Sequence, residues 1–204
     1  MDILKSIDKI CEPDSRQKNF VILDTGTKKW RQRTLQDHYT EINDIKLDSN
    51  VPEKIRIHFD TARNLLLYSW FAYRLIQVAE LHAYASVEFA LREKTGEKKG
   101  GLKRLISLAI KEGWISDSGF RLHHQRIRDQ LNNYKYIYDN KKRAALPNDI
   151  DGNQKYCRVL AEALPYLRNE LAHGSPMLSP GGYAQLAICA DLINQLFKKE
   201  ERDL

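Results

Sequence analysis

The longest run of apolar residues lies between residues 61 and about 94, and this run contains neither glycine nor proline. Its apolar side chains fall nearly all the way round a helix of 3.6 residues per turn. We therefore expect one long helix, either at the centre of a helical bundle or buried by a partner chain. Arg74, Glu80 and Glu88 interrupt every window of about 20 residues, which argues against a membrane span.

Two further periodic patterns follow this run. Between residues 102 and 110 the apolar residues recur at i, i+3, i+4, i+7 and i+8, which predicts a helix with one apolar face, and Gly113 would end it. Alternating steps of four and three between apolar and aromatic residues predict the next helix from about 118 to 139. Proline, asparagine and glycine then indicate a loop from 141 to 154.

The C-terminal part of the chain predicts two more helices. The first is expected from about 155 to 173, where Pro165 would either kink the helix or mark a restart of it. In the last helix Ser179 would be the N-cap and Pro180 the first helical residue. The apolar stripe of that helix consists of Leu186, Cys189, Ala190, Ile193, Leu196 and Phe197.

The first 60 residues form a more polar extension. Residues 19 to 23 are typical of a strand, residues 24 to 27 of a turn, and residues 28 to 34 of a second strand that would pair back as a β-hairpin. We therefore expect two parts, an N-terminal extension over residues 1 to 60 and a helical bundle over residues 61 to 204. The fold class is all-α, an antiparallel bundle of four to five helices with a small N-terminal extension that contains β-structure.

Charge and cysteine content limit the kinds of partner and the cellular compartment that we expect. A formal net charge of +6 and a pI near 9.1 suit a polyanionic partner, and the basic residues concentrate between Arg121 and Arg143. Three tyrosines in that segment could stack on bases, although a solvated basic face over a buried aromatic stripe is the favoured interpretation. Three scattered cysteines predict reduced thiols, and the N-terminus lacks the apolar core of a signal peptide, so a cytoplasmic protein is expected.

One short segment combines an arginine, an amide and a histidine. Arg168, Asn169 and His173 all lie on the helix expected from about 155 to 173. Asn169 and His173 are four residues apart and therefore share one face of that helix, one turn from each other. The forked guanidinium of Arg168 can swing toward an anion held near that face. The segment is therefore the candidate site.

In this segment a polar residue directly follows the arginine, and four residues separate the arginine from the histidine. This pattern resembles the motif of the HEPN superfamily (higher eukaryotes and prokaryotes nucleotide-binding domains). The resemblance covers roughly residues 61 to 199. It implies a homodimeric bundle in which the two motifs face each other across a cleft. In active members it implies cleavage of RNA without a metal ion, often in a defence or toxin setting with a neutralising partner protein. Ser175 stands where some toxins of the family carry a tyrosine, so regulation through that tyrosine is not expected.

The resemblance also implies a role for each motif residue. His173 would be the general acid or base near the 2′-hydroxyl and the leaving oxygen, and Arg168 would stabilise the charge on the phosphate. Asn169 would orient His173 or bind a phosphate oxygen. RNA or a nucleotide is the expected ligand, and no metal ion or cofactor is expected.

Other interpretations of the segment remain open. Arginine and histidine near the C-terminus of a helix are also ordinary capping residues. A non-catalytic module could bind a nucleotide, a nucleic acid or a partner protein, and a purely structural dimerisation bundle is a third alternative. Glu170 and His173 form a Glu-x-x-His step like those of di-iron bundles, but the sequence lacks the second copy that such a site needs.

Overall fold

The computed structural model describes residues 4 to 121, 154 to 175, 178, and 182 to 198. In chain order its elements are η1 (Ile7–Lys9), η2 (Ser15–Asn19), β1 (Val21–Asp24), β2 (Lys29–Gln32), α1 (Leu35–Asn43), α2 (Glu53–Tyr68), α3 (Leu75–Thr95), α4 (Leu102–Lys111), η3 (Asp117–Gly119), α6 (Lys155–Ala172) and α7 (Tyr183–Leu196). Most of the helix expected from 118 to 139, nearly all of the loop after it, most of the basic segment, and the capping pair Ser179 and Pro180 lie outside the described residues. None of the described helices has the length and apolar character needed to cross a membrane.

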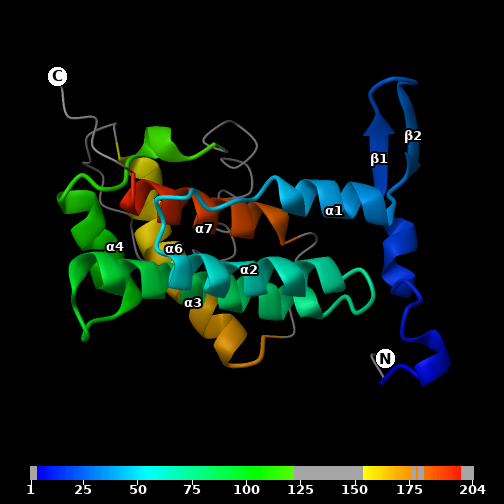
Figure 1. Cartoon of the computed structure of the whole chain (residues 1–204), viewed down its shortest axis with the longest axis horizontal. Coiled ribbons are helices and arrows are strands. Elements are labelled where there is room, and N and C mark those ends of the chain that lie inside the picture. Colours follow the sequence, from blue (N-terminus) through cyan, green and yellow to red (C-terminus); the bar gives the residue numbers. More distant parts are fainter. Residues whose placement is uncertain (1–3, 122–153, 176–177, 179–181, 199–204) are drawn as a thin grey trace, which may run out of the picture.

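The prediction of one long helix over residues 61 to 94 is wrong, because the chain reverses direction inside this run. The helix α2 already begins at Glu53 and ends at Tyr68, where the backbone N–H and the hydroxyl of Ser69 donate to carbonyls in its last turn. The helix α3 then runs back along α2 (Figure 1). This pairing removes from water the apolar surface that a single straight helix would have exposed.

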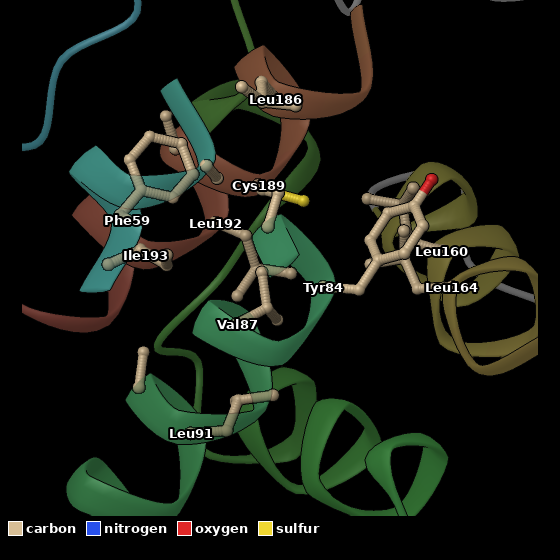
Figure 2. Packing of buried hydrophobic residues seen from close by; sticks show 14 of the residues in the cluster. Phe59, Tyr84, Val87, Leu91, Leu160, Leu164, Leu186, Cys189, Leu192 and Ile193 are labelled. Carbon is tan, nitrogen blue, oxygen red and sulfur yellow. The ribbon is translucent and has the colours of Figure 1, made fainter. Parts of the chain in front are cut away.

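The helix α3 is the centre of the bundle, as the all-round apolar pattern predicts. It packs against α2, α4, α6 and α7. Figure 2 shows Tyr84 of α3 pointing toward Leu160 and Leu164 of α6, while Val87 lies near Leu192 of α7. Each of these side chains is buried or nearly so, and fully burying an aliphatic side chain stabilises the fold by about 1.5–3 kcal/mol.

The helix α6 confirms the pattern from 155 to 173 and carries the candidate motif at its end. Asp117 caps its N-terminus from a distant part of the chain, since its carboxylate accepts the backbone N–H groups of Tyr156 (3.0 Å) and Cys157 (2.9 Å). The helix continues through Pro165 without a restart. It ends at Ala172, and Gly174 follows the C-cap with a φ of 84°, in the left-handed region that glycine adopts without strain.

The helices α4 and α7 also agree with the patterns, and the predicted apolar stripe of α7 faces the core. The expected start of the last helix at Ser179 and Pro180 is wrong, because α7 begins at Tyr183 with Gly182 as its N-cap. The predicted hairpin is confirmed as well. Its strands β1 and β2 are antiparallel, with Leu23 opposite Trp30. The hairpin stands at one end of the molecule, away from the packed helices (Figure 1).

Candidate functional site

The motif occupies the exposed C-terminal end of α6. His173 is the C-cap, and its backbone N–H donates to the carbonyl of Asn169 at 2.9 Å. Asn169 and His173 are exposed, and Arg168 is half-buried. The imidazole of His173 makes no hydrogen bond or ion pair with the part of the chain that the structure describes, and the residue is exposed to solvent. The helical spacing that the sequence indicated is therefore present in the fold.

Arg168 lies within ion-pair distance of a carboxylate of the central helix. Its Nη2 lies 3.6 Å from Oε2 of Glu88, and the other oxygen of Glu88 accepts from Arg92 at 2.6 Å. Arg92 in turn donates to the carbonyls of Lys98 and Gly100, both at 2.9 Å. One carboxylate thus bridges two guanidinium groups, and the cluster retains one positive charge. Such a surplus suits an anionic ligand such as a phosphate.

Asn169 contacts Arg168 and not the histidine. The Nη1 of Arg168 donates to Oδ1 of Asn169 at 3.2 Å. The expectation that the Asn169 side chain orients the His173 ring is therefore not met within the described residues. The other expected role, contact with a phosphate oxygen, agrees with this placement, because the amide and the guanidinium stand together on one exposed side of α6.

Glu88 and Arg92 are the residues that sequence reasoning missed. In the sequence Glu88 served only as a charge that interrupts an apolar run. Its i, i+4 relation to Arg92 was a usable signal for an ion pair on α3. Nothing in the sequence indicated that α6 would bring Arg168 to the same carboxylate, because that contact depends on how α6 packs against α3.

A second polar cluster joins the N-terminal extension to the bundle. Nε2 of His38 lies 3.0 Å and 3.1 Å from the carbonyls of Leu66 and Leu67, which can only accept, so this nitrogen carries the proton. Nδ1 must then accept from the hydroxyl of Tyr183, whose oxygen accepts from Arg33. His38 is buried, and the adjoining cavity of about 10 Å³ has room for about one water molecule. The cluster therefore joins α1 to α2 and α7.

A third cluster is a stacked histidine pair between α2 and α3. The rings of His58 and His82 lie 4.2 Å apart at 11°, with Nδ1 of His58 2.8 Å from the hydroxyl of Ser86. Burial, and then the charge of His82, lower the pKa of His58. One ring nitrogen of each histidine is bonded within the protein, since Nε2 of His82 lies 3.1 Å from the carbonyl of His58, and the pair therefore joins α2 to α3.

Comparisons of this chain with protein-family models, with curated proteins and with solved structures found no match.

Proposed function

We propose that this protein is a homodimeric, metal-independent endoribonuclease of the HEPN type. The observation that supports the proposal is the paired arginine together with the exposed histidine near the end of α6. Arg168 contacts Glu88 and Asn169, and His173 follows Asn169 one turn later on an exposed helix end. A fixed cation and a proton-transfer group are what RNA cleavage without a metal ion requires.

The chemistry assigns a task to each group. The 2′-hydroxyl attacks the adjacent phosphorus atom, a base takes its proton, and an acid protonates the 5′-oxygen that leaves. The reaction therefore needs two proton-transfer groups, and each chain supplies one histidine in the motif. Two copies facing each other provide both, while Arg168 stabilises the additional charge on the phosphate oxygens in the transition state. The products carry a 2′,3′-cyclic phosphate and a 5′-hydroxyl.

Glu88 acts through Arg168 as a positioning residue. One of its oxygens faces Arg168 and the other pairs with Arg92, so the guanidinium of Arg168 is restrained before a substrate binds. Restraint of this kind lowers the entropic cost of reaching the transition state. Changing Glu88 to Gln keeps the shape of the side chain but removes the charge that holds both arginines.

The test measures cleavage of a single-stranded RNA in the presence of EDTA. We expect His173→Ala to lower the rate by about 10²–10⁴-fold and Arg168→Ala by about 10²–10³-fold. Glu88→Gln should cause a smaller loss, of about tenfold. Arg158→Ala is the matched control, because Arg158 is an exposed arginine on the same helix. Circular dichroism and sedimentation would establish that helicity and association are unchanged.

A second RNA in which the nucleotide at the cleaved bond lacks its 2′-hydroxyl tests the mechanism. That substrate should bind but remain intact. Cleavage that requires a divalent ion, or equal rates for wild type and His173→Ala, would refute the proposal. Binding that weakens with salt but produces no cleavage would support a non-catalytic module instead.

A further inference from the structure

One face of the β1–β2 hairpin is apolar and exposed. The register places Leu23 opposite Trp30 and Val21 opposite Gln32, so these four side chains share a face. The exposed fractions are 57% for Val21, 49% for Leu23 and 70% for Trp30. None of the described elements covers this face, which we call the Trp30 face.

The charged residues of the hairpin strands all lie on its opposite face. Asp24, Lys29 and Arg31 alternate with the residues of the Trp30 face. Arg31 is also engaged within the chain, since its guanidinium lies 2.6 Å from the carboxylate of Asp37 and 3.4 Å from that of Asp24. A nucleic-acid surface places cations beside its stacking aromatic residue. The Trp30 face has none, so it suits an uncharged protein surface and not a polyanion.

A two-stranded hairpin with one uncovered apolar face is marginal by itself. Stable sheets have three or more strands, or rest their apolar face against another element. In this chain the hairpin projects from the end of the molecule where no helix lies over it (Figure 1). Its Trp30 face can therefore be approached without obstruction from the bundle.

We propose that the Trp30 face is covered by the same face of a second copy of this chain. A two-fold axis brings identical surfaces together, so each copy must avoid charge repulsion with itself, and this face carries no charge in its paired positions. Two hairpins packed face to face form a small sandwich with a shared apolar layer. One contact thus satisfies the packing requirement of both hairpins.

The size of the face determines the strength of this contact. Three side chains that are about half or more exposed offer a few hundred Å² of apolar surface per copy. A stable interface uses about 800 Å² on each partner. The Trp30 contact alone should therefore give a weak dimer, with a Kd of about 10 µM or weaker.

The experiment follows association by sedimentation velocity from about 5 to about 500 µM. The wild-type chain should associate further with increasing concentration, beyond the dimer proposed for the nuclease. Trp30→Lys and Val21→Lys should each weaken association by about tenfold or more, because each places a charge on the Trp30 face. Ile57→Lys is the matched control, since Ile57 is 63% exposed on α2, outside the Trp30 face. This variant should associate like wild type.

Three results would overturn the proposal. The first is a wild-type chain whose sedimentation coefficient stays the same over the whole range. The second is a concentration-dependent association that Trp30→Lys and Val21→Lys leave unchanged. The third is unchanged self-association together with weakened RNA binding in both variants, which would assign the face to nucleic acid. His173→Ala should associate like wild type, so failure of the proposed nuclease function and failure of the Trp30 contact are separately visible.

Discussion

Glu80 provides the sharpest test of how the bundle is held together. It lies on the central helix α3, is 5% exposed, and its Oε1 has no hydrogen-bond partner among the described residues. Uncharged groups surround it, including Tyr73, the thiol of Cys189 and the start of α7 at Gly182. The described surroundings therefore remove water from the carboxyl group, and no cation among the described residues compensates for this loss.

The cost of ionising Glu80 follows from its pKa. Burial raises the pKa of Glu80 from 4.5 to about 7. The folded protein then binds this proton more tightly than the unfolded chain, so the stability from this group is complete below about pH 4.5 and is lost as the pH rises toward 7. A difference of about 2.5 pKa units corresponds to about 3 kcal/mol of unfolding free energy.

The perturbation is Glu80→Gln, which has nearly the same shape and does not titrate. Urea unfolding followed by circular dichroism gives the unfolding free energy at about pH 5 and about pH 8. Between these values the wild type should lose about 3 kcal/mol more than Glu80→Gln. Comparing how the unfolding free energies of the two proteins change with pH cancels any pH-independent cost of burying the amide.

The control is Glu93→Gln, an exposed position on the same helix that pairs with Lys54 at 2.7 Å. Its loss of stability between the two pH values should match that of the wild type. If Glu80→Gln also loses stability in parallel with the wild type, the carboxyl group of Glu80 is not desolvated and the packing described around α3 is wrong at this point.

Two further predictions concern the junctions of α1 and α7. Burial, and then the charge of Arg33, lower the pKa of His38 from 6.5 to about 4, so its contribution is present above pH 6.5 and is lost as the pH falls toward 4. His38→Asn should abolish a loss of about 3 kcal/mol in urea unfolding over that range. Gly182 has a φ of 57°, and an added Cβ would lie 2.9 Å from Leu66 and 3.1 Å from Ile76. Gly182→Ala should cost about 2–4 kcal/mol in the same assay, against about 1 kcal/mol for Gly174→Ala, which has open space, and equal losses would contradict this packing.

Local patterns in the sequence were sufficient for several elements. The helical spacing after residue 102, the long pattern ending at Gly174 and the two strand-like runs around residues 24 to 27 all form the expected elements. The turn between α2 and α3 was not predictable in this way. It contains neither glycine nor proline, so no local signal marks it. The hydrogen bonds of Ser69 that end α2 accompany the packing of α2 on α3, which is a tertiary contact.

The same distinction between local sequence patterns and tertiary packing applies to the candidate site. The sequence by itself determined that Arg168, Asn169 and His173 lie together at the end of one helix, because helical spacing and the terminating Gly174 are local properties. Only the tertiary structure decided that Glu88 lies within ion-pair distance of Arg168, that Asn169 contacts the arginine, and that Glu80 is buried with no counter-charge among the described residues. These outcomes depend on which face of α3 each neighbouring helix covers, and that is set by the summed packing of the whole core rather than by any short stretch of chain.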